Sequence, residues 1–133
     1  MAGECFSPND LRAFINHHIA LLNRLGLAQE SAFSLIYLKV KESEQYACDE
    51  TFKRMFRNTD AIFNDNEDYV LMLPQTEWNG ASDILSGIQK FLDQESQDNT
   101  VCYPDDGKNA DELMKKLSNI VEDNSSEIIN MLR

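Results

Sequence analysis

The chain has 133 residues, of which 42% are hydrophobic and 26% are charged, and its formal net charge at pH 7 is -11. This length and this apolar content predict a single domain with one hydrophobic core. The negative charge argues against binding to nucleic acid or to an anionic membrane surface, because both require a basic protein surface.

The three cysteines are widely spaced and form no Cys-x-x-Cys pair, so neither a disulfide framework nor a zinc site is predicted. No apolar run reaches the roughly 18 residues that a membrane span requires. The N-terminus has no basic segment followed by an apolar one, as a signal peptide would. We therefore expect a cytoplasmic protein without a metal or a cofactor.

The first predicted element is a helix. Ser7 can cap its N-terminus and Pro8 suits the first helical position. Apolar residues at helical spacing continue as far as Leu25, and Gly26 predicts the end of the helix. His18 falls on this apolar stripe, so we expect it at the edge of the core and not on a metal ion.

Residues 33–41 form an apolar run that is rich in strand-forming residues, and they predict the first strand. Lys39 and Lys41 then lie on the same face of that strand. A second helix is predicted over roughly residues 44–57. Its buried residues are expected to be Cys48, Phe52, Met55 and Phe56.

The middle of the chain predicts a strand hairpin. Residues 60–64 read as a short strand and residues 64–67 supply turn residues. Residues 69–73 are apolar on both faces, which is typical of a central strand that is covered on each side. Apolar residues at helical spacing over 81–92 predict a third helix.

The last part of the chain predicts a strand and a helix. Residues 100–103 form a short apolar run that stops at a Pro-Asp-Asp-Gly turn. Asn109 and Glu112 resemble a capping box that opens the last helix, and residues 125–133 could add a further turn. The predicted fold is α+β, with a βαββαβ core sheet flanked by helices and preceded by an N-terminal helix.

Four segments resemble the GGDEF domain of diguanylate cyclases, in the order of that family. The clearest is Glu-Asp-Tyr-Val-Leu-Met-Leu-Pro, which resembles the end of the GGDEF hairpin and the strand after it. The others resemble the first strand, an Arg-x-x-Asp segment and a Tyr-Pro-x-Asp-Gly turn. The resemblance covers roughly residues 8–123 and implies one degenerate GGDEF-like domain over 1–133. The four segments are residues 33–38, 57–60, 67–74 and 101–107.

The resemblance also implies that the metal site is lost. Active members end the first strand with Asp-x-Asp, whose first Asp binds magnesium, and here these positions are Lys39 and Lys41. Ammonium groups cannot ligate a cation that requires oxygen donors. A lysine would instead form an ion pair with Glu67 or Asp68 on the neighbouring hairpin, a contact of about 0–1 kcal/mol if exposed.

The hairpin turn of the motif also lacks residues that nucleotide binding requires in the family. Asp65 and Asn66 replace the two glycines that let the backbone approach a nucleotide phosphate. Glu67 and Asp68 retain the acidic character of the two positions that follow. Carboxylates without a metal ion repel a triphosphate, so we expect no enzymatic activity.

Arg57 and Asp60 match the Arg-x-x-Asp pair that, in many GGDEF domains, binds cyclic di-GMP as a feedback inhibitor. The resemblance implies that arginine contacts guanine and phosphate while aspartate accepts from the guanine edge. The alternative is that Asp60 fixes a turn and that Arg57 pairs with a nearby acid.

The sequence is best interpreted as a catalytically inactive GGDEF-like domain that regulates bacterial signalling by binding another, unidentified protein. This assignment rests on resemblance alone. One alternative is a cyclic di-GMP receptor that uses Arg57 and Asp60. The other is an acidic α+β adaptor unrelated to GGDEF domains.

Overall fold

The computed structural model describes residues 4–26, 32–57, 59–91, 99–125 and 129–132. In this part of the chain a five-stranded mixed sheet has the strand order β1-β3-β4-β2-β5. The strands are β1 (Glu4–Phe6), β2 (Phe33–Lys39), β3 (Ala61–Asp65), β4 (Asp68–Pro74) and β5 (Thr100–Tyr103).

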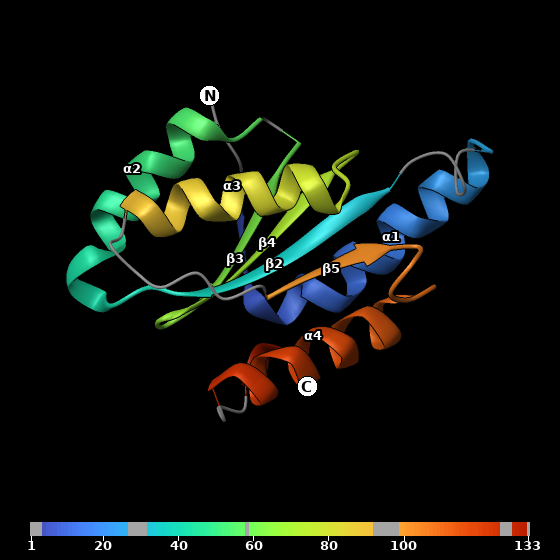
Figure 1. The fold of residues 1–133 in the computed structure, drawn as a ribbon. Coiled ribbons are helices and arrows are strands. Elements are labelled where there is room, and N and C mark those ends of the chain that lie inside the picture. Colours follow the sequence, from blue (N-terminus) through green and yellow to red (C-terminus); the bar gives the residue numbers. More distant parts are fainter. Residues whose placement is uncertain (1–3, 27–31, 58, 92–98, 126–128, 133) are drawn as a thin grey trace.

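Four helices of the described chain cover both faces of the sheet. Helices α2 and α3 lie on one face and α1 and α4 on the other, so the domain has three layers (Figure 1). Among the described residues, no helix is both long and apolar enough to cross a membrane. The helices are α1 (Leu11–Arg24), α2 (Gln45–Met55), α3 (Trp78–Phe91) and α4 (Ala110–Ser125), with 3-10 turns η1 (Pro8–Asp10), η2 (Glu42–Glu44) and η3 (Asn130–Leu132).

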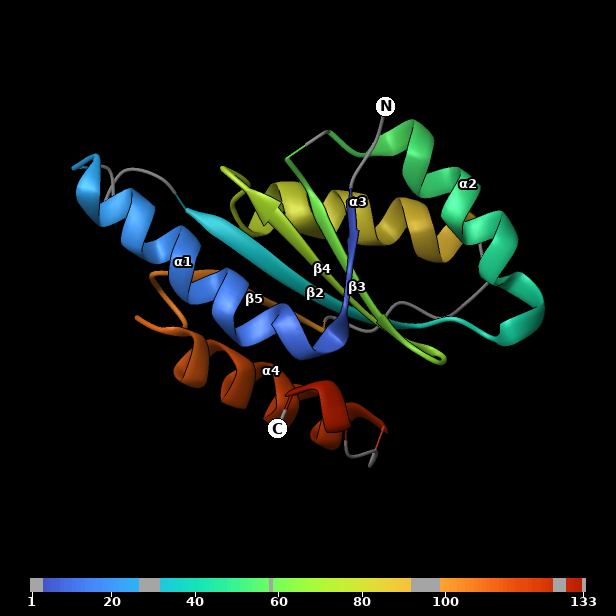
Figure 2. The same ribbon diagram turned by 180° about the vertical axis from the view of Figure 1, so that it is seen from behind.

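The predicted α+β class and the βαββαβ order are confirmed. Strands β2 to β5 pair with one another only in antiparallel fashion, and β2 lies between β4 and β5. The sequence did not predict β1, which pairs in parallel with β3 along the edge of the sheet (Figure 2). This additional strand is what makes the sheet mixed.

The central position of β4 is also confirmed. Val70 and Met72 belong to the core under α1 and α4, whereas Leu71 and Leu73 belong to the core under α2 and α3. Successive side chains of a strand point to opposite faces, so a strand covered on both sides is apolar at every position. This explains the unbroken apolar run of the sequence.

The residues predicted to begin and end helices are largely confirmed. Ser7 Oγ accepts a hydrogen bond from the Asn9 N–H at 3.3 Å, and Gly26 ends α1 with a φ of 71°. Asn109 Oδ1 accepts from the Glu112 N–H at 2.9 Å. The Glu112 carboxylate accepts from the Lys108 N–H and not from the capping residue itself.

Some predictions at the edges of elements are wrong. Met55 was expected to be buried but is 43% exposed, and Leu25, which continued the helical spacing, is 59% exposed. Leu25 follows the last residue of α1 and Met55 is the last residue of α2, so both lie at the ends of their helices. Strand β2 ends at Lys39, and Lys41 caps the turn η2 instead of extending the strand.

The third helix is confirmed over Trp78–Phe91, and residue 92 of the predicted helix lies outside the described residues. In the predicted C-terminal turn, Ile129 and Leu132 are buried around η3. Residues 126–128 and 133 of that segment are likewise not described.

Candidate functional site

The hairpin that resembles the GGDEF motif is a tight two-residue turn. Asp65 and Asp68 are paired in register, and Asn66 and Glu67 form the turn between them. Asn66 has a φ of 57°, in the left-handed region that glycine adopts most readily. Asparagine tolerates this region better than most residues, so the turn forms without the glycines of the motif.

The polar groups of this hairpin are bonded to one another and to adjacent segments. The Asn66 carbonyl accepts from Asn64 Nδ2 and from Gln45 Nε2, both at 2.9 Å. The Tyr37 hydroxyl donates to Asp68 Oδ1 at 2.6 Å. The hairpin is therefore attached both to β2 and to the start of α2.

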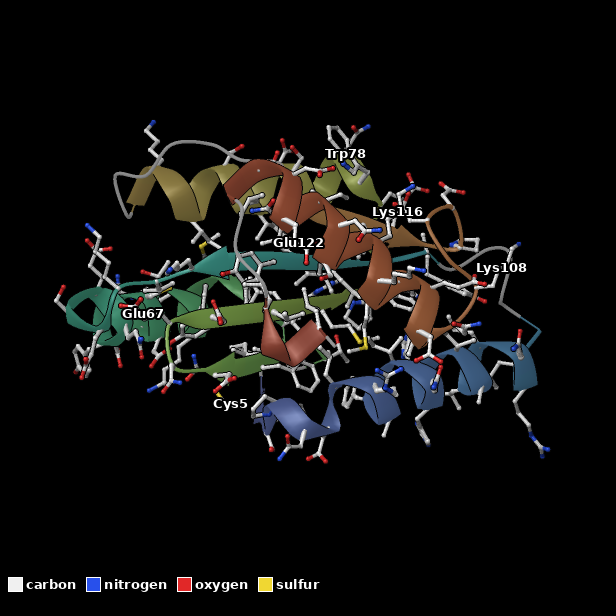
Figure 3. All side chains as sticks on the ribbon, turned by 90° about the horizontal axis from the view of Figure 1, so that it is seen from below. Cys5, Glu67, Trp78, Lys108, Lys116 and Glu122 are labelled. Atoms are coloured by element: carbon white, nitrogen blue, oxygen red, sulfur yellow. The ribbon has the colours of Figure 1, made fainter. Side chains whose placement is uncertain are left out.

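The two lysines are placed near this hairpin. Lys39 is the register partner of Asp68, and the Val40 N–H donates to the Glu67 carbonyl at 2.8 Å, just before Lys41. Both lysines are exposed. The predicted ion pair between a lysine and one of these carboxylates stays a prediction. Figure 3 shows Glu67 at the tip of the hairpin, at the opposite end of the molecule from Lys108.

In the part of the chain that is described, no three His, Cys, Asp or Glu side chains are grouped as a metal site would require. The two buried cysteines, Cys48 and Cys102, have weakly reactive thiols. Burial raises the pKa of the Cys48 thiol to about 12, and the Asp49 and Glu44 carboxylates add to this shift. Burial also raises the pKa of Cys102. Both thiols therefore remain protonated and weakly nucleophilic.

Arg57 and Asp60 lie together at the other end of the sheet and bind each other. Arg57 Nη2 donates to Asp60 Oδ1 at 3.0 Å, and the Arg57 backbone N–H donates to Asp60 Oδ2 at 2.8 Å. The Asp60 side chain is 3% exposed and the Arg57 side chain 52%. The aspartate thus fixes the turn before β3, as the alternative interpretation of this pair expects.

Arg57 also holds the segment that follows β4. Its Nη2 lies 2.7 Å from the Pro74 carbonyl oxygen and 2.9 Å from Thr76 Oγ1. Between these two residues, Gln75 has a φ of 54°. A left-handed conformation costs a residue with a side chain about 1–2 kcal/mol, and the contacts of Arg57 on both sides stabilise it.

A cavity of about 510 Å³ opens beside this arginine. Its lining comes from four segments that are distant in the sequence: the end of β1, one side of α1, the loop before β3 and the end of β4. The volume lies within the usual range for small-molecule sites. The lining residues are Phe6, Phe14, His18, Leu21, Leu22, Arg57, Thr59, Asp60, Pro74 and Gln75.

Aromatic rings form much of the inner wall. Phe6 and Phe14 have ring centroids 4.9 Å apart, and both contact the buried ring of Phe63. The His18 ring meets Phe33 edge to face at 5.1 Å. Burial lowers the pKa of His18, and the neighbouring His17 lowers it further. The wall therefore carries a neutral imidazole at neutral pH.

The sequence indicated only part of this site. It singled out Arg57, Asp60 and His18, but it placed His18 at a core edge and gave no reason to join it to the arginine. Phe6 lies in a strand that was not predicted, and nothing in the sequence marks the left-handed Gln75. The remaining candidates, from Lys39 to Asp68, are at the opposite end of β4 and form a separate region.

Comparison with known proteins does not identify a family. No protein-family model matches this chain. No curated protein sequence shows significant similarity to it either.

Proposed function

We propose that this chain is a catalytically inactive GGDEF-like domain that acts in bacterial signalling as a regulatory module by binding another protein. The observation that carries the proposal is the bonding of the hairpin. Asn66 and Asp68, which the resemblance assigns to the catalytic turn, use their polar groups to hold the hairpin to β2 and α2. Lys39 and Lys41 stand where the resemblance expects magnesium ligands.

The surface of α1 supports a binding role. Leu21 is 45% exposed and Leu25 is 59% exposed, one helical turn apart. Exposed leucines at this spacing present an apolar strip to a partner, and such strips are typical of interaction sites. The strip borders the cavity, because Leu21 also lines it.

Incubation of the protein with GTP and magnesium or manganese tests the catalytic part of the proposal. We expect no cyclic product by chromatography, with or without metal. A Glu67→Gln variant serves as the control. Metal-dependent product from the wild type would contradict the proposal.

A photo-crosslinking amino acid at position 21 tests the binding part. We expect a specific crosslink to one partner protein in cells. The same group at position 46 is the matched control, since Tyr46 is 78% exposed and lies on α2 on the other face of the sheet. Crosslinks that are the same at both positions would argue against an α1 interface.

A cyclic di-GMP receptor is the second candidate, and it is favoured by one observation: both Arg57 and Asp60 line the open cavity. In that case Arg57→Ala and Arg57→Lys should each weaken binding at least about tenfold, or about 1.4 kcal/mol, because lysine does not reproduce bidentate guanidinium contacts. Titration calorimetry measures this directly. Binding that ignores Arg57 would reject this site.

A further inference from the structure

The lining of the cavity beside α1 combines apolar and polar side chains. Phe6, Phe14 and Leu22 contribute hydrocarbon, and the two phenylalanine rings pack on the ring of Phe63. Arg57 and Thr59 contribute polar groups. A cavity that is mostly apolar with a few placed polar groups is the common form of a small-molecule site.

The guanidinium of Arg57 is held in one orientation. Its Nε and Nη2 donate to Asp60, and Nη2 also reaches the Pro74 carbonyl and Thr76 Oγ1. No described residue accepts from Nη1, so this nitrogen can donate to a ligand in the cavity. An arginine whose conformation is already fixed loses little entropy when it binds an anion.

The charged residues near the cavity indicate which net charge a ligand would carry. Residues 11–24 contain none of the 23 acidic residues of the chain and two arginines, of which Arg12 forms an ion pair with Asp111. Asp60 neutralises much of the Arg57 charge from its buried side. The remaining field suits a single negative charge, and it is too weak to hold a highly charged group such as a triphosphate.

We infer that this cavity binds an aromatic monocarboxylate, with its ring against Phe6 and Phe14 and its carboxylate on Arg57. Stacked or edge-to-face rings gain energy beyond their buried area, which favours an aromatic body over an alkyl chain. The inference goes beyond the proposed function, because it adds a small ligand beside the apolar strip of α1.

Calorimetric titration of the whole chain with 2-naphthoate tests the inference, and 2-naphthamide is the uncharged match. We expect naphthoate to bind about tenfold more tightly than naphthamide. This preference should shrink as salt is raised from about 50 mM to about 500 mM, because salt screens the charge on Arg57. Octanoate should bind more weakly than naphthoate. Equal binding of naphthoate and naphthamide, tighter octanoate, or no binding would overturn the inference.

Two variants locate the site. Thr59→Trp places a large side chain at an exposed residue of the cavity lining and should abolish naphthoate binding. Asn119→Trp is the matched control at an exposed residue of the shallower hollow on α4 and should leave binding unchanged. Binding that survives Thr59→Trp would place the ligand elsewhere and reject the cavity.

The combined Arg57→Gln and Asp60→Asn variant removes both charges while keeping polar side chains in place. Naphthoate should then bind about tenfold more weakly, whereas naphthamide should bind as before. Near-ultraviolet circular dichroism verifies that the core is still packed. An unchanged preference for naphthoate in the folded double variant would exclude Arg57 as the anion contact.

Discussion

The two ends of β4 differ in how their polar groups are used. At the hairpin end, Asn66 and Asp68 take part in hydrogen bonds that hold the turn against β2 and α2. At the other end, Arg57 and Asp60 also bind each other, but they do so at the wall of an open cavity.

This difference shows that resemblance to a motif does not tell how open the surroundings of a residue are. The polar groups of the hairpin with the clearest resemblance are bonded within the fold. The cavity combines Arg57 and Asp60 of the Arg-x-x-Asp segment with residues of no motif, such as Phe6 and Leu21. The lining of a cavity depends on which residues lie together in space, and a motif position alone does not give this.

Both ends are positioned by β4, and Leu71→Asp tests whether β4 is the buried central strand of the domain. Leu71 is fully buried, and an unpaired charge there should cost about 3–5 kcal/mol, enough to unfold many domains of this size. Thermal melting followed by circular dichroism measures the loss. Leu21→Asp, at an exposed leucine, should change stability by less than about 0.5 kcal/mol. A cooperative, wild-type-like melt of Leu71→Asp would contradict the assignment of β4.

Arg57→Ala tests the structural role of the pair at the cavity end. It leaves the buried Asp60 carboxylate without its guanidinium partner, and we expect a loss of about 2 kcal/mol in the free energy of unfolding. Arg54→Ala, at an exposed arginine of α2, is the control and should have little effect. In a double-mutant cycle, Arg57→Ala and Asp60→Ala should be coupled by at least about 1 kcal/mol. Additive effects would mean that the pair does not stabilise the fold.

Asn66→Ala tests the hairpin end. Alanine is disfavoured at a φ of 57°, so urea unfolding should show a loss of about 1 kcal/mol. Asn66→Gly should change stability by no more than about 0.5 kcal/mol, because glycine adopts this conformation freely. If alanine and glycine had the same effect, the turn would not depend on backbone conformation at this position.

The smallest effect is expected at His18. Its pKa is lowered from the ordinary value of 6.5, so below that pH the unfolded chain binds more protons than the folded one. Stability should therefore fall as the pH decreases from about 6.5, and His18→Gln should reduce this fall. Unfolding curves between about pH 7.5 and 5 measure the slope. His17→Gln, at an exposed neighbour, should retain more of this pH-dependent fall in stability. Equal slopes in the wild type, His18→Gln and His17→Gln would exclude His18 as the cause.

Much of the fold could be predicted because its main strands and helices have clear periodicity. The apolar run around Leu71, the cap at Ser7 and the stop at Gly26 each follow from local chemistry that the structure confirms. Strand β1 could not be predicted, since three residues carry no period and the pairing of Cys5 with Ile62 is distant in the sequence. Helical periodicity also does not tell where burial stops along a helix, and Met55, the last residue of α2, is exposed.

The candidate site was less predictable than the fold. The spacing of Arg57 and Asp60 indicates that the two side chains can meet, but it does not tell whether they bind each other or a ligand. That depends on Thr76 and Pro74, which supply further acceptors from another loop. The cavity also requires Phe6, whose position depends on the unpredicted strand.

The parallel edge strand β1 has a consequence for the order in which the protein opens. It has three residues and, within the described chain, pairs only with β3, so few hydrogen bonds hold it to the sheet. Its amides should be among the first of the sheet to exchange with solvent, well before those of Val70 and Met72. Because Phe6 ends this strand, the same local unfolding removes one wall of the cavity. For the aromatic ligand inferred above, release of these three residues would widen the entrance to the cavity.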